Sequence, residues 1–372
     1  MNQNKKVLVL GVASVQMDAI IQLKQMGYET YACAMKKDGP GADIADHFEV
    51  INILDKEAII KYIEKNNISL VYSVGSDIAM PVSCYISEKL GMPHFVSEKT
   101  AYICNNKDLM RHALGEGFNG NIAFQVVKNI EEQIQIEFPF ILKPADSQGQ
   151  RGVRLINNYE EYLQNFNISK QYSRSGLVMI EQYISGKELS VNGYVVDGKI
   201  EYLIISDRDT WEQHTGLIHK HIVPACNIDK DMEEDISKII YNACKKLGIN
   251  NGPVYAQMKL EKNKPYIIEI TPRLDGCHMW KLLSYYTGIN LLKLTFEHLL
   301  NNNTAELDLN KSKDEKYVLE FICQQPNTKA DYIEYKNKIE SSVDSFKYYN
   351  QGDNIRPVNG IFDKIGYFIY EI

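Results

Sequence analysis

The sequence lacks the marks of several common protein classes. Its seven cysteines are scattered and show no C-x-x-C spacing, so neither a disulfide framework nor a structural zinc site is indicated. Acidic residues outnumber basic ones, 48 against 41, and no basic excess points to nucleic acid or to an anionic membrane. We expect a globular protein of the reducing cytoplasm.

The N-terminal segment shows neither a signal peptide nor a dinucleotide fingerprint. The apolar run VLVLG at residues 7–11 is too short to cross a bilayer, and no small-residue cleavage site follows it. The turn LGVASVQ has one glycine where NAD-binding folds carry G-x-G-x-x-G. The run is therefore interpreted as a buried strand in a domain that does not bind NAD.

The chain has 372 residues, 44% of them hydrophobic and 24% charged, which fits two or three globular domains. Residues 1–105 alternate apolar strand segments with helical segments such as 15–26 and 56–67. This alternation predicts an α/β domain with a doubly wound parallel sheet.

From residue 106 the pattern changes to hairpins with helices between them. An Asp-Gly turn at 197–198 divides one hairpin, and a turn at 261–264 divides another. We expect an α+β unit over 106–302. A small C-terminal α+β domain is expected over 303–372, where a charged stretch precedes short strands.

The stretch FPFILKPADSQGQRGV, residues 138–153, joins an apolar strand to a polar loop. Lys143 ends the strand, so its stem should be buried and its ammonium group directed. The glycine-bearing loop can turn several N–H groups toward one anion. From these residues alone, an ordinary strand end with a solvated lysine fits as well.

Two glutamates stand at later strand ends. Glu181 ends an apolar strand, and Glu188 begins the next one after a Ser-Gly turn. The strand end can offer backbone groups to an adenine edge, and a carboxylate can accept two hydrogen bonds from a ribose diol. Taken singly, such a glutamate is more often a solvated charge.

The hairpin VYAQMKLEKNKPYIIEITPRL carries the most informative polar set. Pairing through its turn places Gln257, Glu269 and Thr271 on one face. A carboxylate among Tyr and Ile residues is costly to bury unless it meets a cation, and oxygen-only ligands suit Mg²⁺. Arg273 follows on the same face and offers a planar fork to a phosphate or carboxylate.

Five motifs in this order resemble the ATP-grasp superfamily, in its carbamoyl-phosphate-synthetase-like and biotin-carboxylase-like branch. They are VLVLGVASVQ, NKDLMRHAL, FILKPADSQGQRGV, IEQYISGKELSVNG and EITPR, and the resemblance covers about residues 5–300. It implies a pre-ATP-grasp domain over 1–105 and an ATP-grasp domain over 106–302 with a lid at about 120–182. ATP and Mg²⁺, or Mn²⁺, are the implied cofactors.

The resemblance also implies residue roles. The implied ATP-binding residues are Lys107, Lys143, Ser147, Gln148, Gly149, Gly152, Glu181, Gln182, Tyr183 and Glu188. The implied metal ligands are Gln257, Glu269 and Thr271, and the implied catalytic residues are Lys143 and Arg273. At position 271 the family usually has Asn, so Thr271 is the departure that bears on a second metal ion.

The segment SDRDTWEQHTGLIHKHIVPA, residues 206–225, is interpreted as a connection between two strands near the acceptor site. The expected substrate-binding residues here and further on are Arg208, His214, His219 and Asp275. Strand alternation places His219 and His221 on one face. Metal ligation and a substrate pocket or wet sheet face both fit this pair, because no third ligand is apparent.

The implied activity is that of an ATP-dependent carboxylate–amine ligase on small metabolites, amino acids or sugar derivatives, through an acyl-phosphate intermediate. Two alternatives stay open: a bicarbonate-using carboxylase or carbamoyl-phosphate-type enzyme, and a non-catalytic ATP-binding sensor or scaffold. No cysteine nucleophile is required. Partners beyond small molecules are not expected, apart from a second copy of the chain in a homodimer.

Overall fold

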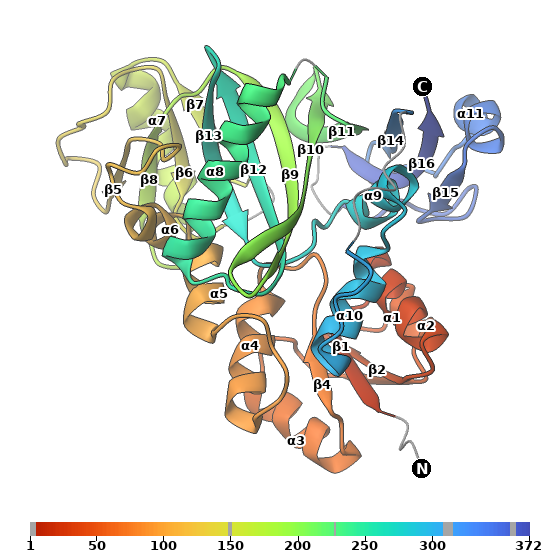
Figure 1. Cartoon of the computed structure of the whole chain (residues 1–372). Coiled ribbons are helices and arrows are strands. Elements are labelled where there is room, and N and C mark those ends of the chain that lie inside the picture. The colour runs from red at the N-terminus through yellow and green to blue at the C-terminus, as the bar shows by residue number, and fades with distance from the viewer. Residues whose placement is uncertain (1–4, 148–150, 227, 308–314, 358–361) are drawn as a thin grey trace.

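The computed structural model describes residues 5–147, 151–226, 228–307, 315–357 and 362–372 (Figure 1). Within these described residues the chain forms three sheets. The N-terminal parallel sheet lies at one end of the molecule. A small antiparallel sheet and a large antiparallel sheet lie at the other (Figure 1).

The first sheet confirms the predicted α/β domain, since all its strands are parallel and their order is β3-β2-β1-β4. The strands are β1 (Lys6–Leu10), β2 (Glu29–Ala34), β3 (His47–Val50) and β4 (Leu70–Tyr72). The helices are α1 (Ser14–Gln25), α2 (Gly41–Ile44), α3 (Lys56–Asn66) and α4 (Ala79–Leu90). Residues 7–10 of β1 are at most 1% exposed, because the central strand of a parallel sheet is covered on both faces.

The second sheet is antiparallel, with the order β5-β8-β6-β7. Its strands are β5 (Phe124–Val127), β6 (Phe140–Pro144), β7 (Arg154–Ile156) and β8 (Val178–Gln182). Helices α5 (Glu98–Asn105) and α6 (Lys107–Leu114) precede it, and α7 (Tyr159–Gln171) packs on it. Phe140, Tyr162 and Phe166 belong to a separate apolar core here, so this sheet is a unit of its own.

The third sheet has eight antiparallel strands in the order β13-β12-β9-β10-β11-β14-β16-β15. The strands are β9 (Lys187–Val196), β10 (Lys199–Trp211), β11 (His214–Val223), β12 (Gly252–Glu261), β13 (Lys264–Thr271), β14 (Tyr317–Gln324), β15 (Asp344–Lys347) and β16 (Asp363–Glu371). Helix α8 (Lys230–Leu247) packs against β10 and α6, and α9 (Met279–Thr287) contacts β11 and β14. Helix α10 (Leu291–Asn301) reaches back to α1 (Figure 1).

Both predicted hairpins are present. The turn residues Asp197, Gly198, Lys262 and Asn263 all have positive φ, at 49°, 77°, 51° and 59°. Two successive positive φ values define the type I′ turn, whose twist matches that of the flanking strands. The second turn leaves Glu261 opposite Lys264, as the sequence predicts.

Two details of the sequence interpretation need correction or refinement. Residues 206–225 are not a connection between strands, because most of them lie within β10 and β11, which pair as a hairpin. The chain after residue 303 does not form a sheet of its own: β14 pairs with β11 and extends the large sheet. The tail adds η2 (Ile333–Tyr335), α11 (Lys336–Glu340) and a small apolar cluster, and its domain boundary stays a prediction.

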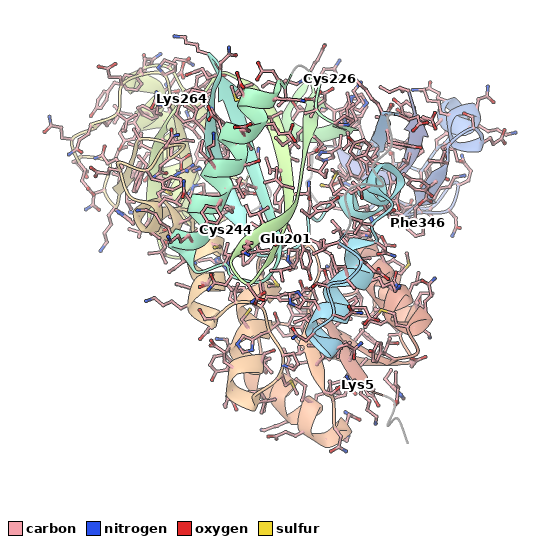
Figure 2. All side chains as sticks on the ribbon, in the orientation of Figure 1. Lys5, Glu201, Cys226, Cys244, Lys264 and Phe346 are labelled. Atoms are coloured by element: carbon pink, nitrogen blue, oxygen red, sulfur yellow. The ribbon has the colours of Figure 1, made fainter. Side chains whose placement is uncertain are left out.

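All seven cysteines are free, and they come from different parts of the fold. Cys244 lies in α8 and Cys226 follows β11 (Figure 2). Within the parts of the chain that the structure describes, no helix is both long and apolar enough to cross a membrane.

A close backbone contact joins the N-terminal domain to the loop after β13. Gly75 follows β4 with φ +65°, and a Cβ built on it would lie 2.7 Å from the Cα of Gly276, in the loop after β13. Only glycine permits both this φ value and this approach. The contact brings the carboxyl end of β4 to the end of β13, where ligands bind in open α/β sheets.

We therefore expect Gly75→Ala to destabilise the protein more than Gly91→Ala. Gly91 has the same φ of +65°, but a Cβ there meets nothing within 4 Å. Gly91→Ala should cost about 1–2 kcal/mol from its left-handed backbone alone. Chemical denaturation measures both variants, and equal losses of unfolding free energy would show that the loops can separate freely.

Candidate active site

Arg273 lies where the two domains meet. Its guanidinium pairs with Asp77, from the loop after β4, and its Cζ lies 5.5 Å from the ring centroid of Tyr255. Arg273 is 5% exposed. Asp77 offsets the burial of this cation, and it was not selected from the sequence because nothing local marks it.

Lys143 forms a buried ion pair. Its Nζ lies 2.5 Å from Oε2 of Glu181, and the Nε of Arg111 donates to Oε1 of the same carboxylate at 2.9 Å. Burial alone would raise the pKa of Glu181, but the two cations hold it at about 2. Burial lowers the pKa of Lys143 to about 8, against the opposing effect of Glu181. The ammonium is thus directed, as predicted, and poised near neutral pH.

Arg111 is fully buried and joins its own helix, α6, to strands of two sheets. Besides Glu181 on β8, it donates to the carbonyl oxygens of Ile267 and Ile268 on β13 at 2.6 and 3.0 Å. It also donates to Oδ1 of Asn121 at 3.1 Å. The sequence interpretation missed this residue; the strong amphipathic pattern of NKDLMRHAL, with an arginine on the buried side, was the available signal.

Because Lys143 has a pKa of about 8, ATP affinity should fall as pH rises through that value. The sign follows from linkage: if Lys143 contacts the phosphates as predicted, deprotonation removes a positive charge that would favour them, and phosphate groups are already ionised there. Calorimetric titration with ATP between pH 6.5 and 9.5 measures the effect. In Lys143→Arg the charge persists, so its affinity should stay flat; a parallel fall in both proteins would assign the effect to another group.

The loop after β6 lies beside Lys107. The Nζ of Lys107 donates to the carbonyl oxygen of Ser147 at 3.0 Å. The backbone N–H of Lys107 donates to the carbonyl oxygen of Ala145 at 3.1 Å. Asp146 fixes the loop by accepting N–H bonds from Arg174 and Ser175 at 2.9 and 2.8 Å. The predicted phosphate loop therefore begins between the two predicted phosphate-binding lysines.

The other predicted lid and adenine positions are partly described. Gln148 and Gly149 lie outside the described residues. Gly152 has φ +73°, and a Cβ there would lie 2.9 Å from Tyr172. The N–H of Gln182 donates to Ala123 at 2.9 Å, and Lys259 lies 5.7 Å from the ring centroid of Tyr183.

Glu188 lies among polar side chains from three adjacent strands. Its carboxylate pairs with Arg208 on β10 and accepts a 2.8 Å hydrogen bond from Nε2 of Gln257 on β12. Lys259 is the cross-strand partner of Glu188, and its Nζ lies 3.7 Å from Oε1 of that carboxylate. The carboxylate is thus partly buried and held by fixed donors, while its predicted contact with ribose stays a prediction.

The predicted metal ligands lie side by side on β12 and β13. Gln257 and Glu269 are direct cross-strand partners, and Thr271 stands two residues further along β13. The Oγ1 of Thr271 is buried, and no described residue forms a hydrogen bond with it. Among the residues the structure describes, no hydrogen bond or ion pair satisfies the Glu269 carboxylate. These oxygen donors fit Mg²⁺, which prefers such ligands together with nucleotide phosphates and water.

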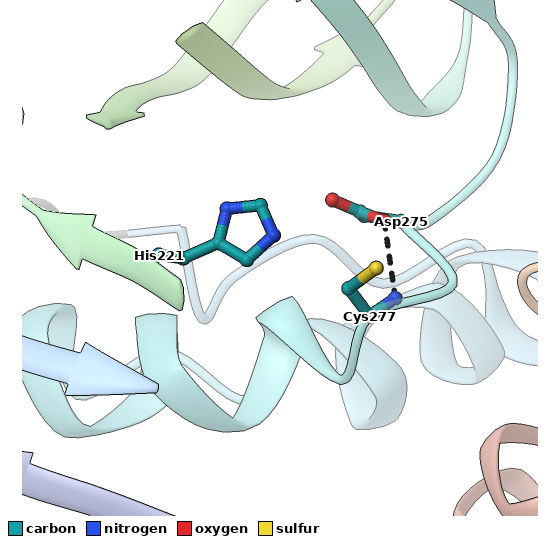
Figure 3. A group of neighbouring side chains, drawn as sticks. All are labelled: His221, Asp275 and Cys277. Atoms are coloured by element: carbon teal, nitrogen blue, oxygen red, sulfur yellow. Dashed lines mark hydrogen bonds between the residues drawn. The ribbon is translucent and has the colours of Figure 1, made fainter. Parts of the chain in front are cut away.

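The predicted substrate residues separate into two places. Arg208 stands opposite His221 across β10 and β11, and Asp275 lies close to His221 (Figure 3). His219 instead stacks on Trp211, with ring centroids 3.8 Å apart. The pairing of β10 with β11 shifts register between Asp209 and Trp211. His219 and His221 therefore have different neighbours, which alternation along β11 alone did not predict.

His214 and His219 contact the tail. The ring of His214 lies 4.9 Å from Phe362, and Nε2 of His219 lies 3.6 Å from a carboxylate oxygen of Glu320 on β14. Burial would raise the pKa of Glu320, but His219, Tyr370 and Lys338 hold it at about 2. The tail thus supplies the neighbours of these two histidines, and their role in substrate binding stays a prediction.

Several buried polar atoms on strands around Arg208 have no hydrogen-bond partner among the residues that the structure describes. They are Oγ of Ser190, Nδ2 of Asn192, Nε of Arg208, both ring nitrogens of His221, Oγ1 of Thr271 and Oδ2 of Asp275. Unsatisfied buried polar atoms are rare in native proteins, and a bound water, ion or ligand is a common explanation for them. Their concentration between β9, β10, β11 and β13 indicates a binding site.

Residues 136–280 match the family model of the ATP-grasp domain. The chain carries an ATP-grasp domain. The matched segment holds the predicted phosphate loop, the Glu181–Glu188 region and the predicted metal ligands, which belong to the last three of the five sequence motifs. Two solved structures with this fold contain ADP or its magnesium salt: the biotin carboxylase domain of the Hydrogenobacter thermophilus 2-oxoglutarate carboxylase, at 16% identity, and the Staphylococcus aureus N5-carboxyaminoimidazole synthetase, also at 16% identity.

Curated relatives include formate-dependent phosphoribosylglycinamide formyltransferases of Prochlorococcus marinus. The protein of strain MIT 9515 is 24% identical over 85% of this chain and 81% of its own length. Another match is 26% identical, and there the chain spans about half, 48%, of the relative's length. Alanine–anticapsin ligase of Bacillus subtilis is 26% identical over 59% of this chain and 52% of its own.

The whole fold also has solved counterparts. The L-amino acid ligase of Bacillus licheniformis superposes with a TM-score of 0.84 at 18% identity, covering 100% of this chain and 94% of the other. At this identity the likeness establishes the fold. The superposition includes the residues after 303, whose strands continue the large sheet.

Proposed function

We propose that the protein is an ATP-dependent, ADP-forming ligase that joins a small carboxylate to a small amine. The observation that carries the proposal is the set of oxygen donors at Gln257, Glu269 and Thr271 next to the buried Arg273. Relatives of the ATP-grasp class include an alanine–anticapsin ligase and an L-amino acid ligase, which supports amino acids as substrates.

In the first step, a carboxylate oxygen of the substrate attacks the γ-phosphorus of ATP and the bond to ADP breaks, leaving an acyl phosphate. Mg²⁺ bound by the oxygen donors of β12 and β13 would neutralise phosphate charge. Lys143 and Lys107 hold the phosphates between them, and Arg273 stabilises charge on the acyl phosphate. The predicted lid, about 120–182, would exclude water during this step.

In the second step, the nitrogen of an amine attacks the acyl carbon, loses a proton and expels phosphate, forming an amide. Positioning and fixed charges do this work, so no nucleophilic side chain is needed. Arg273 can exchange its bond with Asp77 for the anionic intermediate, since the two groups face each other at the domain contact. A cytoplasmic location and a homodimer stay predictions.

The test is phosphate release from Mg·ATP with pooled amino acids, amino sugars, simple carboxylates and bicarbonate. Release that requires both a carboxylate and an amine, and disappears in Glu269→Ala, supports the ligase. Release with bicarbonate and a single amine would support the carboxylase alternative, for which solved carboxylase relatives provide a precedent. ATP binding without release in any mixture would contradict the proposal and favour a sensor.

A further inference from the structure

Three side chains that offer nitrogen, oxygen and sulfur as metal ligands lie close together near Arg208. His221 comes from β11, and Asp275 and Cys277 come from the loop between β13 and α9. One ligand atom of each lies within 4.8 Å of the other two, and Figure 3 shows them facing a common space. Their convergence depends on the pairing of β10 with β11 and on the path of the chain after β13.

The donors are buried and available. His221 is 0% exposed, and within the described parts of the chain neither of its ring nitrogens has a hydrogen-bond partner. Asp275 is 5% exposed; one of its oxygens accepts the N–H of Cys277 at 3.0 Å and the other, Oδ2, has no partner. An imidazole buried with both nitrogens unsatisfied is costly, and a bound ion together with a water would satisfy it.

We propose that His221, Asp275 and Cys277 bind a borderline divalent metal ion of the Zn²⁺ and Co²⁺ class. Nitrogen, oxygen and sulfur donors select such ions, whereas the oxygen-only set around Glu269 selects Mg²⁺. Three protein ligands leave one tetrahedral position for water or for a substrate atom. On binding, the Cys277 thiol releases its proton to solvent and the metal keeps its oxidation state.

The charges around this three-residue site are compatible with an ion. The Asp275 carboxylate and the Cys277 thiolate bring two negative charges, which offset a divalent cation. The Nζ of Lys364 lies 3.6 Å from Sγ of Cys277, placed to donate to a ligating thiolate as outer-sphere groups do. The other cations that act on Asp275, Arg273 and Arg208, are paired with Asp77 and Glu188.

The experiment is a titration of the full-length protein with Co²⁺ in excess Mg²⁺ and without ATP. Excess Mg²⁺ occupies the oxygen-only site and does not compete for thiolate and imidazole. The wild-type protein should show a near-ultraviolet thiolate-to-cobalt charge-transfer band and strong visible bands of tetrahedral Co²⁺. Both should saturate at one ion per chain.

Cys277→Ser should lose the charge-transfer band, and Cys226→Ser should keep it. Cys226 is a matched control, because it is also partly buried and has a lysine Nζ 3.8 Å from its sulfur. Asp275→Asn, which keeps the cysteine, should weaken Co²⁺ binding by about 10-fold or more. Circular dichroism of each variant establishes that it is folded.

A wild-type protein without the charge-transfer band would overturn the proposal, and so would a band that survives in Cys277→Ser. The unsatisfied atoms would then belong to a substrate or to water. The readout uses neither ATP nor substrate, so its failure would leave the proposed ligase activity standing.

Discussion

Glu269→Gln should lower phosphate release by about 100- to 1000-fold, the equivalent of the several kcal/mol that a bound metal supplies to phosphoryl transfer. The substitution keeps the size of the side chain and removes the charge. The residue lies opposite Gln257, and the two arginines that act on it electrostatically, Arg208 and Arg273, are ion-paired with Glu188 and Asp77 instead. Its charge is therefore available to Mg²⁺. Steady-state phosphate release with the substrates found in the pooled assay measures the loss.

The matched control is Glu201→Gln, an exposed carboxylate on β10 (Figure 2). It should leave turnover unchanged, because a surface charge this exposed interacts weakly with its surroundings. Raising the Mg²⁺ concentration should partly restore Glu269→Gln if the amide oxygen still ligates weakly. A variant with turnover within a few-fold of wild type would exclude Glu269 as the central metal ligand.

Arg111→Met should cost about 3–5 kcal/mol of unfolding free energy, the range for breaking a buried ion pair on one side. The substitution leaves Glu181 with one cation in place of two. It also removes the donors to the Ile267 and Ile268 carbonyl groups of β13. Buried acceptors left without donors add to the loss. Urea denaturation followed by circular dichroism measures it.

Two further variants separate charge from geometry. Arg111→Lys keeps the positive charge but not the planar fork, so its loss should be intermediate. Arg154→Met removes an exposed arginine from β7 in the same small sheet and should change stability by no more than about 0.5 kcal/mol. Equal stability of Arg111→Met and wild type would mean that the three elements joined by Arg111 hold together without it.

Much of the candidate site was readable from sequence because it is local. The turn residues Lys262 and Asn263 fix the register of β12 and β13, and that register alone places Glu269 opposite Gln257. Likewise, Lys143 ends an apolar strand, so its stem is buried whatever surrounds it. Periodicity and turn chemistry are properties of short segments, and here the tertiary structure preserves them.

Residues that depend on long-range contacts were missed. Asp77 reaches Arg273 only because the loops at Gly75 and Gly276 meet, 201 residues apart in the chain by their numbers. Arg111 meets Glu181 because α6 packs between two sheets. The sequence interpretation took β11 for a connection, because a polar, histidine-rich segment gives only a weak strand signal. Its pairing with β14, which is distant in the chain, identifies it as a strand.

The sequence by itself determined the parallel N-terminal sheet, the two hairpins and the ATP-grasp motifs, because each rests on neighbouring residues. Only the tertiary structure decided which polar groups meet. It paired Arg273 with Asp77, placed His219 against Glu320, and gave His221 the neighbours Asp275 and Cys277, which alternation along one strand could not supply. The physical reason is that charge pairing and ligation act over a few ångströms, between atoms that only the packed fold brings together.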